Sequence, residues 1–397
     1  MKRYVNFIFI SSDWLHYHRR EFTKSLSENI KDWGEVVVVE APVSLTVNLF
    51  IKFKSRLLSW LKGNLKPGKK ADGLVFITPL ILFHIKLWER SGIFGKTDCF
   101  LINKQLRSFI KKNYKDHKIS YWFYEPEHYM LALSNLNSKI VYDYYDDHEF
   151  NYDGSIKPDK VRKNKILVSE ADLTVCLSKF TTERLSNYGD NVIYLKNSSS
   201  LKSYYQNEAK NVDEYYSFKK DKKLIGYLGT VRNWIDFSYI EEVLKNIEDA
   251  NLVLVGPVLK NVEKEVDKLR KYKNFFTVGF VHPDQIYDHI KKFDAGIIPF
   301  KVNNFTKSVF PNKFFEYAVC NVPVVSTNLP ELEEYRDDIG YAATPKEFSD
   351  FCRNALNGNF KDKIIRNRKN AEENTWDISV AGLNKILKKK FGIEEKI

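Results

Sequence analysis

Short, uninterrupted apolar runs constrain the fold of this sequence more than any other feature. One run occupies residues 295–299, and another begins the predicted strand at 322–327. A polar loop and a helix-like segment, beginning near Pro311, separate the two runs. Continuous apolar runs of this length are typical of strands buried on both faces of a parallel sheet. The order strand, loop, helix, strand therefore predicts an α/β fold.

The same alternation begins at the N-terminus. Residues 4–10 and 35–39 have strand patterns, and residues 19–30 between them have a helical pattern, which predicts a βαβ unit. Further strands are predicted at 73–77, 121–124, 140–144, 171–177, 191–195, 224–228, 252–255 and 275–278, and further helices at 103–113 and from Asp236 to about 247. Several strands end in polar residues. In open α/β sheets the ligand site lies at that end of the strands.

The length of 397 residues favours two domains. Residues 197–222 interrupt the alternation and are predicted to contain the linker. We expect an N-terminal domain at 1–200, a linker at 201–222, a second domain at 223–375 and a final helix at 376–397.

Composition favours an anionic partner, because Lys and Arg outnumber Asp and Glu by 63 to 51. Nucleic acid is not expected, since the basic residues are dispersed and no compact binding module is present. No phosphate-loop motif is found, which argues against nucleoside triphosphate hydrolysis. Four widely spaced cysteines favour a reducing compartment. With no signal peptide and no apolar run long enough to span a bilayer, we expect a cytoplasmic protein, peripheral on the inner face of the membrane.

Residues 41–71 contain no acidic residue, and their apolar residues repeat at helical spacing. The basic and aromatic members of this segment are Lys52, Lys54, Arg56, Trp60 and Lys62. A basic amphipathic helix with a tryptophan is typical of a membrane-surface helix. The alternative is a helix packed on its domain with solvated lysines.

Two groups of candidate binding residues lie in the second half of the sequence. Lys313 and Glu316 are three positions apart, so they share a helix face that could hold an anion and a diol. An exposed ion pair is the alternative. Gly229 follows the predicted strand at 224–228, and Arg232 lies in the turn beyond it. This arrangement favours contact with a phosphate. A surface arginine in a loop is the alternative.

Two groups of candidate catalytic residues lie in the first half of the sequence. Asp146, Asp147 and His148 follow one predicted strand, and close carboxylates suit a general base. Turn formation and helix capping by aspartate is the alternative. His16 follows the first strand and could act as a base or contact phosphate, or could lie in a solvated helical turn.

With both halves considered, the sequence resembles the GT-B glycosyltransferases close to family four, and more narrowly bacterial teichuronic acid and exopolysaccharide transferases. The residues that carry the resemblance are 224–229 with Trp234 and Asp236, 254–257, 279–281, 294–300, Lys313 with Glu316 and Tyr317, and 323–327, with weaker matches at Asp13, Trp14, Tyr142, Asp143, Asp146, Asp147, Ala171 and Asp172. The resemblance implies two facing Rossmann-like domains, with a C-terminal helix crossing back to the first domain.

The resemblance also implies roles for individual residues. Glu316 would hold ribose hydroxyls, Lys313 and the turn from Gly229 to Arg232 would face the diphosphate, and the backbone near Phe280 would meet the base. The implied donor-binding residues are Gly229, Thr230, Arg232, Gly256, Phe280, Val281, Asn312, Lys313 and Glu316. No metal or cofactor is implied, because cationic side chains and helix dipoles stabilise the leaving diphosphate.

The sequence departs from the family at two places. Thr230 and Asp236 stand near positions where common members carry an arginine and a lysine, and Arg232 is the candidate substitute. Ser308 stands where the family has the first glutamate of a pair. That difference leaves an inverting mechanism open, with Asp146 as the first candidate base and Asp147 as the second.

We therefore expect a hexosyltransferase-type glycosyltransferase that moves a sugar from a nucleotide sugar, with UDP favoured, to a bacterial, lipid-linked glycan acceptor in surface polysaccharide biosynthesis. Two alternatives are a nucleotide-sugar 2-epimerase of the same fold and a non-catalytic nucleotide-sugar-binding assembly subunit.

Overall fold

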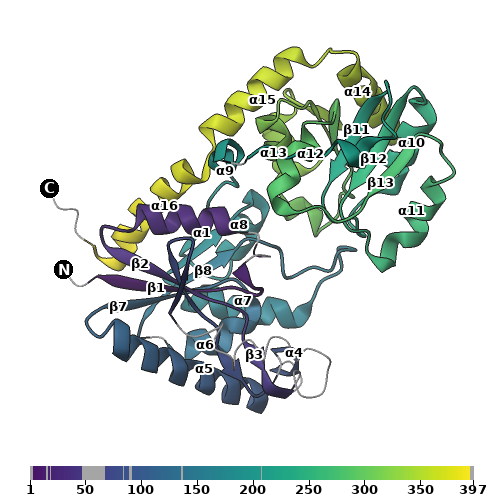
Figure 1. The fold of residues 1–397 in the computed structure, drawn as a ribbon. Coiled ribbons are helices and arrows are strands. Elements are labelled where there is room, and N and C mark those ends of the chain that lie inside the picture. The colour runs from purple at the N-terminus through teal and green to yellow at the C-terminus, as the bar shows by residue number, and fades with distance from the viewer. Residues whose placement is uncertain are drawn as a thin grey trace. The chain divides into compact units, whose positions relative to one another are not determined.

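The computed structural model describes residues 3–14, 17, 19–46, 68–83, 85–88, 92–135, 137–206 and 208–393. The chain forms two compact units (Figure 1). The first unit comprises Met1–Glu149, Lys157–Leu195 and Ser379–Ile397, and the second comprises Phe150–Ile156 and Lys196–Ile378. Each unit is built on its own largely parallel sheet, so the predicted α/β fold is confirmed.

The first unit contains an eight-stranded sheet in the order β10-β9-β8-β7-β1-β2-β5-β4. Its strands are β1 (Tyr4–Phe9), β2 (Gly34–Val39), β4 (Lys69–Ala71), β5 (Leu74–Ile77), β7 (Lys118–Phe123), β8 (Lys139–Tyr144), β9 (Leu173–Cys176) and β10 (Val192–Tyr194). The neighbours pair in parallel, except that β4 is antiparallel to β5. Two short strands, β3 (Val43–Ser44) and β6 (Leu80–Ile81), pair separately.

Helices cover both faces of this sheet. They are α1 (Arg20–Asn29), α4 (Ile85–Trp88), α5 (Gly92–Asn113), α6 (Tyr129–Leu133), α7 (Pro158–Glu170), α8 (Lys179–Ser186) and the end of α16 (Trp376–Phe391), together with the 3-10 turn η2 (Pro126–His128). In Figure 1, α5 lies on the opposite side of the strands from α1. The α5 face buries Ile102 and Leu106 in the core cluster of β1 and β7, whereas Phe22 of α1 contacts the ring of Trp122.

The second unit contains a six-stranded parallel sheet in the order β13-β12-β11-β14-β15-β16. Its strands are β11 (Lys223–Leu228), β12 (Ala250–Val255), β13 (Phe275–Val278), β14 (Ala295–Ile298), β15 (Val324–Thr327) and β16 (Gly340–Ala342). Its helices are α9 (Leu201–Gln206), α10 (Phe237–Asn246), α11 (Glu263–Leu269), α12 (Ile286–Ile290), α13 (Lys313–Val319), α14 (Pro345–Leu356) and α15 (Lys361–Glu373), with 3-10 turns η3 (Asp213–Tyr216), η4 (Lys260–Val262), η5 (Pro283–Gln285), η6 (Thr306–Ser308) and η7 (Pro330–Tyr335).

The last helix packs on the first unit through its C-terminal part. Val380, Leu383 and Leu387 of α16 are buried there. Asn384 accepts a hydrogen bond of 2.8 Å from the indole of Trp33 and donates one of 2.8 Å to the carbonyl of Asn29. These contacts agree with the predicted C-terminal helix that returns to the first domain.

Three local features of the structure differ from the sequence prediction. The helix predicted from Pro311 begins at Lys313, and the helix predicted at 103–113 begins much earlier, at Gly92. The stretch 197–222, predicted to contain the linker, lies in the second unit and contributes Val212 and Tyr216 to its core. These differences arise because tertiary packing, rather than local pattern, sets the ends of these elements. No helix among the described residues is long and apolar enough to cross a membrane.

Candidate functional site

The strongest candidate site lies where the strand order of the second sheet reverses. In the sheet, β11 lies between β12, which is the next strand in the sequence, and β14. The ladder between β11 and β14 joins Ile225 to Ala295 and Gly226 to Gly296. Further along β11, the Leu228 N–H donates instead to the hydroxyl of Tyr317, at 3.1 Å. Such a reversal leaves a crevice at the carboxyl ends of the strands, where ligands bind in open α/β sheets.

Glycines allow aromatic rings to pack against the strands at this point. A Cβ atom added to Gly226 would lie 2.3 Å from the ring of Phe293, and one added to Gly296 would lie 2.5 Å from the ring of Tyr317. The two rings also contact each other, with centroids 6.3 Å apart. The small residues therefore position Tyr317, which in turn holds the end of β11.

The turn after β11 brings backbone and a cation together. Gly229 has a φ of +134°, and a Cβ atom there would lie 2.8 Å from both Cε and Nζ of Lys313. The neighbouring Gly256 has a φ of +133°, and a Cβ atom there would lie 2.3 Å from the Gly229 carbonyl oxygen. Glycine is favoured at both positions because other residues rarely adopt this φ, and at Gly256 the Gly229 backbone also leaves no space for a side chain. The Thr230 carbonyl accepts a hydrogen bond from the Tyr227 hydroxyl.

Lys313 and Glu316 lie on α13 beside this turn. The Lys313 ammonium is 5.2 Å from the ring centroid of Tyr227 and 5.6 Å from that of Phe300. Neither Lys313 nor Glu316 forms an ion pair with any residue that the structure describes, so the alternative of an exposed ion pair is wrong. Burial raises the pKa of Glu316, and the nearby charge of Lys313 partly opposes that rise.

Arg232 lies between two aromatic rings just beyond the turn. Its guanidinium carbon is 4.6 Å from the ring centroid of Tyr152 and 4.8 Å from that of Trp234. The Nε of Arg232, the Oδ1 of Asn233 and the Nε1 of Trp234 are all buried without a hydrogen-bond partner. Buried polar atoms normally have partners, so three consecutive exceptions indicate a place where a ligand or water completes the structure.

Tyr152 was not predicted, and no local signal identifies it. It belongs to the short segment Phe150–Ile156, which packs with the second unit although its flanking residues belong to the first. Asn303 donates a hydrogen bond of 3.0 Å to the Tyr152 carbonyl, and the rings of Tyr152 and Phe305 meet edge to face at 4.9 Å. The sequence separation of Tyr152 from Arg232 explains why sequence reasoning missed this contact.

The remaining predicted donor residues lie near the ends of neighbouring elements. Phe280 follows β13 and is 66% exposed, and Val281 beside it is half-buried. The Gly256 N–H donates to the Val278 carbonyl, which joins the ends of β12 and β13. Asn312 precedes α13, and its side-chain oxygen accepts a hydrogen bond from Asn197. An exposed phenylalanine at the carboxyl edge of the sheet is available to stack on a planar ligand.

The predicted catalytic residues of the first unit are in contrasting environments. Asp146 is exposed on the loop after β8. Asp147 is buried, where it accepts hydrogen bonds from Arg184 at 2.7 Å and from the Tyr144 hydroxyl at 2.8 Å. Because its oxygens already have these structural partners, Asp147 is not retained as a candidate base. His16 and the segment containing Lys52, Lys54, Arg56, Trp60 and Lys62 lie outside the described residues.

A histidine and a glutamate that were not predicted as a pair lie near Asp146. The Nε2 of His148 is 3.1 Å from the Tyr124 carbonyl oxygen, so that nitrogen can donate its proton there. The Nδ1 is 3.6 Å from the carboxylate of Glu125. Within the part of the chain that is described, no group of three His, Cys, Asp or Glu side chains is arranged to hold a metal ion.

The sequence of the second unit matches a known family. Residues 222–357 match the family Glycosyl transferases group 1. The putative teichuronic acid biosynthesis glycosyltransferase TuaH of Bacillus subtilis (strain 168) is 27% identical to this chain over 159 residues. That match covers 39% of this chain and 40% of TuaH, so it spans less than half of either protein.

Solved structures match nearly the whole chain. Sucrose-phosphate synthase from Thermosynechococcus elongatus superimposes with a TM-score of 0.70 at 11% identity, covering 99% of this chain and 100% of that structure. Anabaena Alr3699/HepE, solved in complex with UDP and glucose, superimposes with a TM-score of 0.65 at 11% identity, covering 99% and 100%. This chain therefore has the GT-B fold, and its residues 222–357 are similar to the family Glycosyl transferases group 1.

Proposed function

We propose that this chain is a glycosyltransferase that moves a hexosyl group from a UDP-sugar to a hydroxyl group of a glycan acceptor. One observation carries the proposal. Lys313 and Arg232 are half-buried cations beside the Gly229 turn, and neither has an ion-pair partner among the described residues. Cations held partly out of water need an anionic partner, and a diphosphate supplies one. The UDP bound to the Anabaena protein of the same fold supports this choice of ligand.

The neighbouring side chains suit the rest of a nucleotide. Glu316 lies one helical turn beyond Lys313, and its carboxylate accepts no hydrogen bond from the residues described, so it can accept bonds from ribose hydroxyls. Phe280 and Val281 can contact the base at the end of β13. Asn312, Thr230 and Gly256 complete the proposed donor site.

The chemistry follows from these assignments. The bond between the anomeric carbon and the diphosphate oxygen breaks, and a bond to the acceptor oxygen forms. Lys313 and Arg232 stabilise the negative charge that develops on the departing UDP. The acceptor proton passes to a base, for which exposed Asp146 is the proposed group. Ser308 donates its hydroxyl proton to the Phe305 carbonyl and supplies no carboxylate, which supports an inverting reaction.

Two further observations bear on the acceptor. The name of the Bacillus relative points to a bacterial surface polysaccharide, and the acid-free segment 41–71 points to an anionic membrane. A lipid-linked glycan at the inner face of the cytoplasmic membrane would be both a precursor of a surface polysaccharide and a substrate located at an anionic membrane. In this proposal the first unit, which includes residues 379–397, binds the acceptor, and the second unit, which includes residues 197–222, binds the donor.

Binding of UDP to the Glu316→Ala variant tests the donor assignment. UDP is expected to raise the melting temperature of the wild-type chain, because it binds only the folded state. Loss of the hydrogen bonds to ribose should weaken UDP affinity about 10- to 100-fold, measured by calorimetry. Glu373→Ala is the matched control, since Glu373 is an exposed carboxylate on another helix of the same unit. Equal UDP affinity of the wild type and Glu316→Ala would rule out this role for Glu316.

Incubation with a UDP-sugar alone separates the proposal from its alternatives. A transferase should leave the sugar configuration unchanged until an acceptor is supplied. Conversion to a 2-epimer without acceptor would instead identify an epimerase. Tight UDP binding without turnover on any lipid-linked acceptor would indicate a non-catalytic binding subunit.

A further inference from the structure

The outward face of α5 in the first unit carries both large apolar and cationic side chains. Their spacing of three and four residues places them along one stripe of the helix. The stripe consists of Ile93, Lys96, Phe100, Lys104, Arg107 and Lys111, all exposed. Ile93 is 73% exposed and Phe100 is 65% exposed. Two large apolar side chains this accessible, two turns apart on one helix face, favour an interaction surface.

The charge of this stripe is not balanced locally. Lys96, Lys104, Arg107 and Lys111 form no ion pair with any residue of the described ranges. The acidic residue of α5, Asp98, is fully buried on the opposite side of the helix. Its carboxylate accepts hydrogen bonds from the Trp88 indole at 2.8 Å and from the Leu82 N–H at 2.9 Å. The α5 stripe is therefore positive and apolar at the same time.

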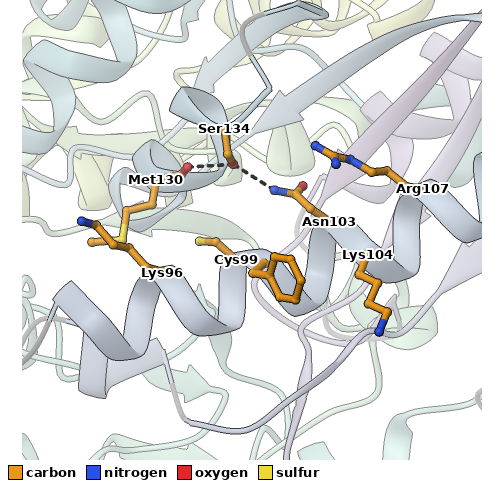
Figure 2. Close-up of a pocket in the computed structure, with 8 residues that line it drawn as sticks. Lys96, Cys99, Asn103, Lys104, Arg107, Met130 and Ser134 are labelled. Carbon is orange, nitrogen blue, oxygen red and sulfur yellow. Dashed lines mark hydrogen bonds between the residues drawn. The ribbon is translucent and has the colours of Figure 1, made fainter.

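A cavity of about 470 Å³ opens beside the stripe, lined by residues of α5, by Met130 of α6 and by Ser134, which follows α6. Figure 2 shows Lys96, Lys104 and Arg107 along α5, with Met130 and Ser134 facing them from the α6 side. The side-chain amide of Asn103 donates to the Ser134 hydroxyl at 2.9 Å, and that hydroxyl donates to the Met130 carbonyl at 3.0 Å. These polar groups satisfy one another, which leaves apolar side chains, including Cys99 and Met130, to line the cavity.

We propose that the α5 stripe and its cavity dock this protein on a bilayer that contains anionic phospholipid. Lipid phosphates would pair with Lys96, Lys104 and Arg107, while Ile93 and Phe100 enter the boundary between headgroups and acyl chains. An acidic protein partner would satisfy the cations but gives less reason for the two highly exposed apolar side chains, Ile93 and Phe100, on the same stripe. This assignment deepens the proposed membrane partner, and it depends on neither the donor site nor the segment 41–71.

Vesicle flotation of the full chain tests the proposal without nucleotide. We expect the wild type to float with vesicles of phosphatidylcholine and phosphatidylglycerol, to remain unbound with phosphatidylcholine alone, and to bind less as salt increases. Lys104→Gln combined with Arg107→Gln should weaken binding by about fivefold for each charge removed. Phe100→Ser should weaken binding at low and at high salt, because it removes apolar contact rather than charge.

Lys361→Gln combined with Ile365→Ser is the matched control, because both residues are exposed on α15 of the second unit. This control variant should float like the wild type. Failure of the wild type to float would overturn the proposal. Unchanged flotation of the α5 variants, with loss only in Lys52→Gln combined with Lys54→Gln, would assign the contact to segment 41–71 instead. The UDP-induced melting shift, measured on every variant, separates failure of this proposal from failure of the donor site.

Discussion

Near the carboxyl ends of the strands, buried charged side chains are paired in the first sheet, whereas two cations of the second sheet have no carboxylate partner among the described residues. In the first unit, Arg19 and Asp143 pair at 2.6 Å with almost no exposure of either side chain, and buried Asp147 pairs with Arg184 at 2.7 Å. In the second unit, Lys313 and Arg232 have aromatic neighbours but no carboxylate partner among the described residues. The first sheet therefore neutralises its buried charges internally, and the second leaves two cations available.

This difference distinguishes structural charges from ligand-binding ones. A buried ion pair contributes little net stability, but removing one partner leaves an uncompensated charge and is costly. Burial raises the pKa of Asp143, and Arg19 opposes that rise, so the pair depends on both members. A half-buried cation with no partner has unused capacity for an anion. Substitutions in the first unit should thus affect stability, and those in the second should affect ligand affinity.

The largest effect is expected from Arg19→Met. It leaves the Asp143 carboxylate buried without its cation, which should cost about 3–5 kcal/mol of the unfolding free energy of the first unit. Native-state hydrogen exchange localises the effect, because amides of β8 should lose protection while those of β12 should not. The double variant Arg19→Met with Asp143→Leu should recover most of the loss. Wild-type protection of β8 in the single variant would contradict the contrast between the units.

A second effect concerns the pH dependence of the first unit. Burial lowers the pKa of His128 to about 4 from an ordinary value of 6.5. The unfolded chain then binds a proton at a higher pH than the folded chain, so stability is complete above pH 6.5 and falls as the pH drops toward 4. The full loss is roughly 3 kcal/mol, from a difference of about 2.5 pKa units.

The His128→Leu variant should remove this pH dependence, measured as β7 amide protection at pH 7 and pH 5 after correction for intrinsic exchange. The neighbouring Glu127 provides an internal check. Burial acts to raise the pKa of Glu127, but its ion pairs with Lys160 and Lys163 outweigh burial and lower the pKa to about 2, so its contribution is lost only below pH 4.5. A stability loss between pH 6.5 and 4 that persists in His128→Leu would show that another group titrates there.

The smallest effect on stability, but a clear effect on binding, is expected from Lys313→Ala. Removal of a charge-assisted contact should reduce UDP affinity by about 10- to 100-fold, corresponding to about 1.5–3 kcal/mol, as measured by calorimetry. The unfolding free energy should change by no more than about 0.5 kcal/mol, because no ion pair is broken. Lys346→Ala is the control, since Lys346 is an exposed lysine paired with Asp350 on α14. Undiminished UDP affinity in Lys313→Ala would remove the contrast between the units.

Much of the fold was accessible from sequence, because its strongest signals are local. The apolar run at 295–299 became β14, and the predicted strand at 275–278 became β13 with the same bounds. A helix was predicted to begin at Asp236, and the Asp236 side chain accepts a hydrogen bond from the Ser238 N–H at the start of α10. The edge strand β4 was missed, because it is short and pairs antiparallel in an otherwise parallel sheet.

Less of the candidate site than of the fold could be predicted from the sequence. The sequence by itself determined the alternation of buried strands and helices, and so placed Gly229, Lys313 and Glu316 after strands of one parallel sheet. It could not decide which charges would be paired. Only the tertiary structure paired Asp147 with Arg184 and set Arg232 between Tyr152 and Trp234. Strand formation follows from neighbouring residues, whereas the partner of a charge depends on which distant segments the sheet order brings together.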